Sequence, residues 1–239
     1  MAGRRVLIQA SSSTIPTYVM QNVQLPDKIL KGIDRVNRNF LWGSTDNSRK
    51  MHWVSWEKVT TSKELGGLGI QSAKGRNTAL LAKLNWRFHA ESNAMWAKVL
   101  RLKYGTRQRI NARDESKLPR SPIWRGLKKG EQVFKEGMKW IPGHDSQLDF
   151  WRDSWSDLGP LRSILHGPLP LEASNLKVKD VISPHGWLWS AIPFVLPPEI
   201  KESIQAVPFP IAARSVDKLA WNGSPKGVFS SKGAYRLAT

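Results

Sequence analysis

Four aspartates recur at every fourth position in the segment GHDSQLDFWRDSWSD, residues 143–157. They are Asp145, Asp149, Asp153 and Asp157. If this segment were helical, the four carboxylates would share one face, because residues four apart are neighbours on a helix. Carboxylates grouped in this way hold the metal ions of nucleases and polymerases. A metal-dependent hydrolase or polymerase site is therefore the first hypothesis to weigh.

The local sequence opposes a helix across this segment. Pro142-Gly143 favours a turn just before it, and Gly159-Pro160 interrupts the chain just after it. In an extended segment, Asp149 and Asp153 would lie roughly 13 Å apart, whereas two-metal chemistry needs ions about 4 Å apart. We therefore favour a hairpin of residues 136–141 and 146–151, with aspartates that cap its turns, and we expect no metal site.

The composition bounds the class of protein. The chain has 239 residues, 40% of them hydrophobic, which is enough for one large core or two small ones. It has 12 Trp and no Cys, so it contains no disulfide, no thiolate zinc site and no cysteine nucleophile. No apolar run approaches 18 residues, and the run after Arg4-Arg5 is too short and polar for a secretory signal. We expect an intracellular protein of the nucleus or cytoplasm, without a cofactor.

The positive charge is concentrated in the first part of the chain. The net charge is +18, and residues 1–139 hold 27 Lys+Arg against 10 Asp+Glu. Residues 140–239 hold 10 against 9. A field of this kind favours a polyanionic partner. Nucleic acid suits it better than a membrane, because the basic helices also carry aliphatic and aromatic stripes typical of a core.

Periodicity and stop signals predict the main elements. A helix over residues 25–43 ends at Gly43, and Ile29, Ile33, Val36 and Phe40 would form its buried face, with a basic face outside. Further helices are expected over residues 77–91, 92–105 and 122–137, the last with Ser121 as N-cap. Residues 217–221 and 228–231 would form a second hairpin. The predicted fold is mainly α with two small β-hairpins (α+β): a basic helical module over 1–139 and a Trp-rich irregular section over 140–239.

The basic helices and the loop that follows them form the predicted nucleic-acid surface. Lys and Arg at helical spacing can hold a phosphate backbone without reading the sequence. The alternative is a basic face that contacts only solvent. The candidate contact residues are Lys74, Arg76, Lys83, Arg87, Lys98, Arg101, Lys103, Arg107, Arg109 and Arg113.

A series of motifs in a fixed order points to a family. It includes GRRVLIQASSSTIPTYVMQ, RKMHWVSWEKV, KELGGLGI, NTALLAKLNWRF, WAKVLRLKYG, KEGMKWIPGHDSQLDFWRDSW and DKLAWNGSPKGVFSSKGAYRL. From Ala2 to Leu237 the chain resembles the open reading frame of plant LINE-type (non-LTR) retrotransposons, which encodes proteins named reverse transcriptase or ribonuclease H. The resemblance implies that residues 1–139 match the polymerase thumb and connecting region. It also implies that the chain ends within the start of a truncated zinc-binding reverse transcriptase segment.

The catalytic motifs of that family are missing from this chain. The polymerase motif is Tyr-x-Asp-Asp, but no two aspartates are adjacent here, and the cysteines of the zinc segment are absent. We therefore expect a non-catalytic fragment that binds a template–product duplex non-specifically. One alternative is a decayed retroelement fragment with no independent role. Another is an accessory part of polymerase or ribonuclease H activity, assembled with a separate palm-containing or zinc-binding retroelement chain.

Overall fold

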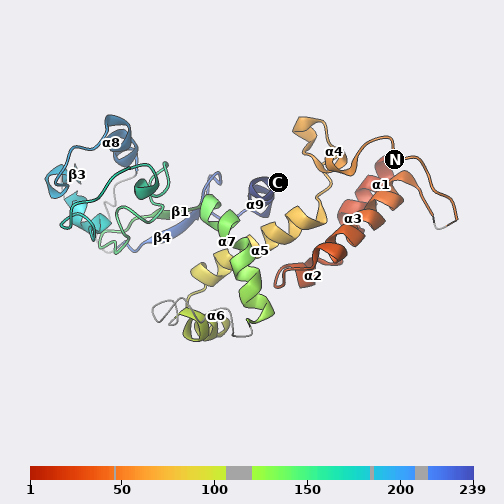
Figure 1. Ribbon diagram of the computed structural model, residues 1–239, viewed down its shortest axis with the longest axis horizontal. Coiled ribbons are helices and arrows are strands. Elements are labelled where there is room, and N and C mark those ends of the chain that lie inside the picture. Colours follow the sequence, from red (N-terminus) through yellow and green to blue (C-terminus); the bar gives the residue numbers. More distant parts are fainter. Residues whose placement is uncertain (46, 106–119, 184–185, 208–214) are drawn as a thin grey trace. The chain divides into compact units, whose positions relative to one another are not determined.

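The computed structural model describes residues 1–45, 47–105, 120–183, 186–207 and 215–239 (Figure 1). The chain divides into two compact units. Unit 1 comprises Met1–Glu136 and Ser230–Thr239, and unit 2 comprises Gly137–Phe229. Helices predominate, and the described residues contain two small two-stranded antiparallel sheets, which confirms the predicted fold class. The last ten residues, grouped by sequence with the Trp-rich section, belong to unit 1.

Unit 1 is helical throughout its described elements. Its α-helices are α1 (Ala2–Leu7), α2 (Thr17–Met20), α3 (Asp27–Trp42), α4 (Trp56–Thr60), α5 (Ala73–Ala90), α6 (Met95–Leu100), α7 (Pro122–Gly137, which ends at the unit boundary) and α9 (Ser231–Ala238). Short 3-10 or π-helical turns are η1 (Ile8–Ser12), η2 (Lys63–Leu65) and η3 (Arg101–Gly105). Helix α5 packs against α2, α3 and α9, and it is the element around which unit 1 is organised.

Polar groups at the start and in the middle of α5 fix its position. Ser72 is the N-cap and accepts a hydrogen bond from Gly75 N–H at 3.2 Å, while Asp34 of α3 accepts one from Ala73 N–H at 2.9 Å. The buried side chain of Asn77 donates to the carbonyl oxygens of Met20 and Val23. Because a buried amide without partners is costly, these bonds hold α5 in one register against the segment after α2.

Helix α7 crosses α5 at very short distance. A Cβ atom at Gly130 would lie 2.3 Å from the backbone carbon of Leu81, so only glycine fits at this position. Asn85 of α5 donates from Nδ2 to the carbonyl oxygen of Leu127 at 2.7 Å. The predicted N-cap of α7 is confirmed, because Ser121 Oγ accepts a hydrogen bond from Trp124 N–H at 3.2 Å. Its predicted C-terminus at Gly137 is also confirmed.

Helix α3 has its predicted end but not its predicted buried face. Gly43 ends the helix in the left-handed conformation, with φ of 75°. The buried residues are Leu30, Asn37 and Leu41, a stripe turned about a quarter of the circumference from the predicted one. Three residues of the predicted face are exposed instead: Ile29, Val36 and Phe40. Ile33, the fourth residue of the predicted face, is half-buried. The tertiary hydrogen bonds of Asn37 and Asp34 set which side of α3 packs against the rest of unit 1. The spacing of apolar residues carries no information about these bonds.

Unit 2 contains both sheets. Strand β1 (Met138–Ile141) pairs antiparallel with β4 (Lys218–Trp221), with Met138 opposite Trp221, and β2 (Ile182–Ser183) pairs with β3 (Gly186–Trp187). The remaining elements are η5 (Leu161–Ser163), η6 (Val178–Val181), η7 (Trp189–Ala191) and helix α8 (Pro198–Gln205).

Both hairpins predicted from the sequence pair differently in the structure. Residues 146–151 do not pair with β1; Phe150 N–H donates to Leu176 O, and Val178 N–H donates to Leu148 O, both at 3.0 Å. Burial of Phe150 in the core draws this segment away from β1. The turn after β4 does form, with Trp221 N–H bonded to Gly227 O at 2.8 Å, but residues 228–231 form no strand.

The core of unit 2 is built on tryptophan. Trp151 and Trp155 are fully buried, and both indole N–H groups are satisfied, by Ala173 O at 2.6 Å and Phe150 O at 2.9 Å. Phe150 lies against both rings, with centroids 4.6 and 5.1 Å away. Large aromatic rings with paired polar atoms stabilise a core whose regular secondary structure is sparse.

Candidate nucleic-acid interface

The aromatic cluster around the end of α5 joins four elements that carry basic side chains. Leu81, Leu84, Leu100 and Leu127 form its buried part. Around them pack Phe88 of α5, Trp96 of α6, Tyr104 of η3 and Trp124 of α7, and the Tyr104 and Trp124 rings stack at 4.5 Å. These rings serve as core anchors. The cations of α5, α6, η3 and α7 are therefore carried on one packed helical cluster within unit 1.

Four of the predicted contact residues are exposed lysines. Lys74 and Lys83 lie on α5, Lys98 on α6 and Lys103 on η3. Lys103 lies over the Tyr104 ring at 5.4 Å. Within the described part of the chain, none of the four forms an ion pair. No described carboxylate therefore neutralises these four charges, which leaves them available to an anionic ligand.

Lys74 and Lys83 lie on different sides of α5. Lys74 lies nine positions before Lys83. At 100° per residue this spacing places the two side chains on opposite sides of α5. The structure therefore does not bring Lys74 into one surface with Lys83. The other exposed lysines of the cluster are Lys83 on α5, Lys98 on α6 and Lys103 on η3.

The three arginines of α5 and η3 that the sequence suggested each have partners within unit 1. Arg76 is half-buried and donates from Nη2 to Thr17 Oγ1 at 2.8 Å, and burial lowers its pKa. Arg87 forms a two-pronged pair with Glu91, Nε to Oε1 at 2.8 Å and Nη2 to Oε2 at 3.1 Å. That pair raises the pKa of Arg87 and lowers the pKa of Glu91.

Arg101 closes the end of α5. It donates from Nη1 to Ser92 O at 2.8 Å and from Nη2 to Phe88 O, and its guanidinium lies 4.7 Å from the centroid of the Phe88 ring. Phe88 is in the last turn of α5, where carbonyl groups have no partner within the helix. Arg101 is thus a helix C-cap, and as a direct phosphate contact it is a poor candidate.

Two exposed cations of this cluster are absent from the set predicted by the sequence, and three residues of that set lie outside the described residues. Arg125 and Lys129 lie one turn apart on the exposed side of α7, which packs on α5. They form no ion pair within the described ranges, unlike Lys128 and Lys135, which both pair with Glu131. The high density of basic residues after position 98 was the signal that could have found them. Three predicted residues lie outside the described residues: Arg107, Arg109 and Arg113.

One titratable ring lies within this basic cluster. His89 stacks on Phe134 with centroids 5.0 Å apart and an interplanar angle of 11°. Burial, and next the positive charge of Arg101, lower the pKa of His89 below its usual range. The shift favours the neutral form of the ring, so His89 contributes little to the positive field.

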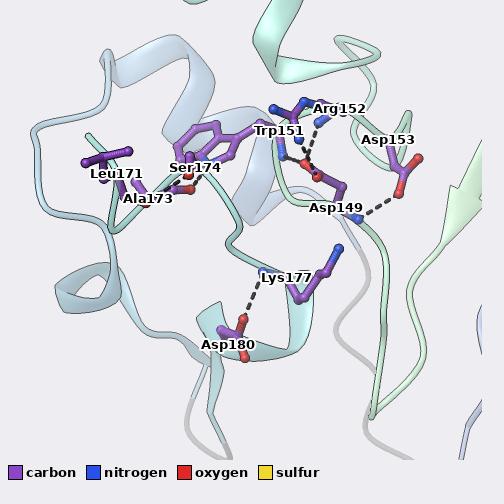
Figure 2. Close-up of polar contacts among 9 residues, drawn as sticks. All are labelled: Asp149, Trp151, Arg152, Asp153, Leu171, Ala173, Ser174, Lys177 and Asp180. Atoms are coloured by element: carbon purple, nitrogen blue, oxygen red, sulfur yellow. Dashed lines mark hydrogen bonds and ion pairs between the residues drawn. The ribbon is translucent and has the colours of Figure 1, made fainter. Parts of the chain in front are cut away.

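The aspartate row does not form a metal site. Residues 145–157 are not helical, and the side chains of Asp149 and Asp153 bind the local backbone (Figure 2). Asp149 Oδ1 accepts hydrogen bonds from the N–H groups of Trp151 and Arg152, both at 3.0 Å, and Asp153 Oδ2 accepts one from Asp149 N–H at 2.7 Å. Asp157 pairs with Lys139 at 2.5 Å. Among the described residues, no group of three or more His, Cys, Asp or Glu could hold a metal ion.

The turn at Gly143 is held by residues far along the chain. Gly143 N–H donates to Asp217 Oδ1 at 2.8 Å, and His144 N–H donates to Ser215 O at 2.9 Å. The aspartate that accepts this hydrogen bond is therefore Asp217, and not one of the aspartates of residues 143–157. In the part of the chain that the structure describes, no helix is long and apolar enough to cross a membrane.

Two proteins of Arabidopsis thaliana are similar to the chain. The "Putative ribonuclease H protein At1g65750" is 35% identical over 243 residues, an alignment that covers all of this chain and 39% of that protein. The "Uncharacterized mitochondrial protein AtMg00310" is 30% identical over 142 residues, covering 59% of this chain and 92% of that protein. No family model matches the chain, and no solved structure matches it. The chain thus spans well under half of the first relative and almost all of the second at 30% identity, and it belongs to the protein family of AtMg00310.

Proposed function

We propose that unit 1 binds the backbone of a nucleic-acid duplex without sequence preference, and that the chain is a retroelement-derived fragment with no catalysis of its own. The observation that carries the proposal is the set of exposed, unpaired cations on the aromatic-cored cluster: Lys83, Lys98, Lys103, Arg125 and Lys129. The similarity to a relative named as a ribonuclease H protein supports a nucleic-acid substrate. The motif order in the sequence supports the further proposal that the chain derives from the thumb and connecting region of a plant LINE-type reverse transcriptase.

The chemistry of lysine suits this role. Its ammonium group is a compact charge on a flexible stem, so it can follow phosphates of either strand without a fixed geometry. Each phosphate neutralised on a B-form duplex contributes about −0.9 to the slope of log K against log salt concentration. Four lysine contacts would therefore contribute about −3.6 to that slope. A hybrid duplex is expected to behave similarly.

The test compares two variants that lose the same charge at different places. The first carries Lys83→Gln, Lys98→Gln, Lys103→Gln and Lys129→Gln. The matched control carries Lys28→Gln, Lys31→Gln, Lys50→Gln and Lys58→Gln, all exposed positions of unit 1 outside the cluster. Binding to a labelled RNA–DNA hybrid is measured across a salt series.

The first variant should bind more weakly, and its slope of log K against log salt concentration should become shallower by most of the about 3.6 that four lysines supply. The control variant should keep nearly all of the wild-type affinity and of the wild-type slope. Equal losses in the two variants would show that only the total charge matters and would refute a surface on this cluster. Binding by the wild-type chain that does not depend on salt would refute backbone binding altogether.

One observation favours a different outcome. The exposed apolar residues Ile29, Val36 and Phe40 follow one side of α3, and such surfaces on an isolated chain promote association. A decayed fragment without a role would aggregate through them. An accessory subunit would cover them with a separate palm-containing or zinc-binding retroelement chain. A monomeric, cooperative thermal transition at increasing protein concentration would count against the decayed fragment.

A further inference from the structure

Unit 2 contains an open surface pocket of about 500 Å³, called the cavity below, that the proposed backbone binding does not use. Its wall comes from η7, the segment that follows it, and the first turns of α8. The residues that matter for its chemistry are Trp189, Ser190, Phe194, Val195 and Lys201. A volume of this size falls in the range of small-molecule sites, and a mostly apolar lining with a few polar groups is typical of them.

The aromatic wall rests on the buried core. Phe194 stacks on the fully buried Trp151, with centroids 5.6 Å apart and an interplanar angle of 22°. Trp189 lies against Trp187 at 6.4 Å, and Trp187 stacks on the fully buried Trp155 at 5.5 Å. Because both rings are supported from behind, the cavity is formed before any ligand arrives. Little ordering of side chains then opposes binding.

One cation lies at the edge of the cavity. Lys201 Nζ is 5.0 Å from the centroid of the Trp189 ring. Among the described residues it forms no ion pair, although Glu199 and Glu202 are its close neighbours in sequence. Ser190 is exposed at the rim and offers a hydroxyl group. Flat apolar walls beside a single cation are complementary to a planar ring that carries a negative charge.

We propose that this cavity binds a planar heteroaromatic group bearing an anion, of which a nucleoside monophosphate is a simple example. The ring would lie against the Phe194 side chain, and the anion would meet Lys201, which lies over the Trp189 ring. Since the cavity belongs to unit 2 and the proposed backbone surface to unit 1, this site does not depend on the proposed function.

The experiment measures binding of AMP to the full chain by equilibrium dialysis, with adenosine and ribose 5-phosphate as the arms that lack the anion or the ring. The Lys83, Lys98, Lys103 and Lys129 variant defined above serves as background, so that phosphate held by unit 1 is removed. AMP should bind more tightly than adenosine, and ribose 5-phosphate should bind least. Equal binding of AMP and ribose 5-phosphate would overturn the proposal, as would no binding of AMP.

Single substitutions then locate the site. Lys201→Gln should reduce AMP affinity toward that of adenosine, while Lys226→Gln, an exposed lysine in the turn after β4, should leave it unchanged. Val195 is 94% exposed, so a charge there should not disturb folding. Val195→Glu should weaken AMP binding by about two- to fivefold and Val195→Lys should strengthen it, as expected for a surface charge near the anion. AMP binding that is indifferent to all three changes at Lys201 and Val195 would overturn the assignment.

Discussion

Replacing Arg101 separates its structural role from a role in binding. Arg101→Gln removes two hydrogen bonds from a charged donor to backbone carbonyls and the contact with the Phe88 ring. Bonds to charged groups contribute about 1.5–3 kcal/mol when buried. A cation–π contact at a partly exposed site adds about 0.5–1 kcal/mol. Because Arg101 is only half-buried, we expect a total loss of about 2–3 kcal/mol.

The assay is thermal unfolding of the full chain, with Lys98→Gln as the matched control one turn away on α6. A loss of about 2–3 kcal/mol should lower the melting temperature of a domain of this size by about 5–10 °C. Lys98 is exposed, so its replacement should change stability by less than about 0.5 kcal/mol. In the hybrid-binding assay the order should reverse, and Lys98→Gln should reduce the salt slope more than Arg101→Gln does.

Two results would refute this reasoning. If Arg101→Gln unfolds at the wild-type temperature, the guanidinium does not cap α5. If it also reduces the salt slope by about 0.9, Arg101 contacts a phosphate directly. Arg101→Lys keeps the charge but loses the planar fork, so it should be destabilised like Arg101→Gln and should bind like the wild-type chain.

Three further predictions follow from the packing of unit 1. Gly130→Ala should destabilise the chain by about 1–3 kcal/mol despite the better helix propensity of alanine, because the new Cβ would meet the backbone of Leu81; a denaturation midpoint at or above that of the wild-type would contradict the close crossing. On α3, Leu30→Ala should cost about 2–4 kcal/mol and Val36→Ala less than about 1 kcal/mol, whereas the face predicted from the sequence would give Val36 the larger loss. His89 has a lowered pKa, so below its ordinary value of 6.5 the unfolded chain binds a proton that the folded chain does not. The stabilisation that comes from keeping His89 uncharged is therefore complete above pH 6.5, and it is lost as the pH falls through the lowered pKa. Replacing this residue, His89→Gln, should flatten the decline in unfolding free energy between pH 7 and 5. An unchanged decline would show that His89 is not responsible.

Features that depend on neighbouring residues could be predicted from the sequence. Helix α7 begins after Ser121 and ends at Gly137, and α3 ends at Gly43, because caps and stops are decided within a few residues. The mainly helical class followed from the same signals. The bonding of aspartates such as Asp149 to their own turn is equally local, since an Asx side chain reaches the backbone two residues on.

Features that depend on residues far apart in the chain could not be predicted from the sequence. Strand β1 pairs with β4, so Met138 meets Trp221 rather than the nearer residues 146–151. The sequence pattern predicted residues 146–151 as the partner of β1, but the burial of Phe150 and Trp151 in the tryptophan core removes that segment from the pairing. The same holds for α3, which carries two apolar stripes a quarter-turn apart. Which stripe packs depends on hydrogen bonds from other helices.

The candidate surface shows this division between local and distant information most clearly. Charge and spacing made Lys83, Arg87 and Arg101 equivalent, but the structure gives the arginines to carbonyl and carboxylate partners and leaves the lysine exposed. The planar guanidinium presents several donors in a fixed geometry, which suits the unpaired carbonyls at the end of α5 and the carboxylate of Glu91. A surface left mainly to lysine lacks bidentate geometry, so the binding that we propose would follow phosphate density rather than base identity.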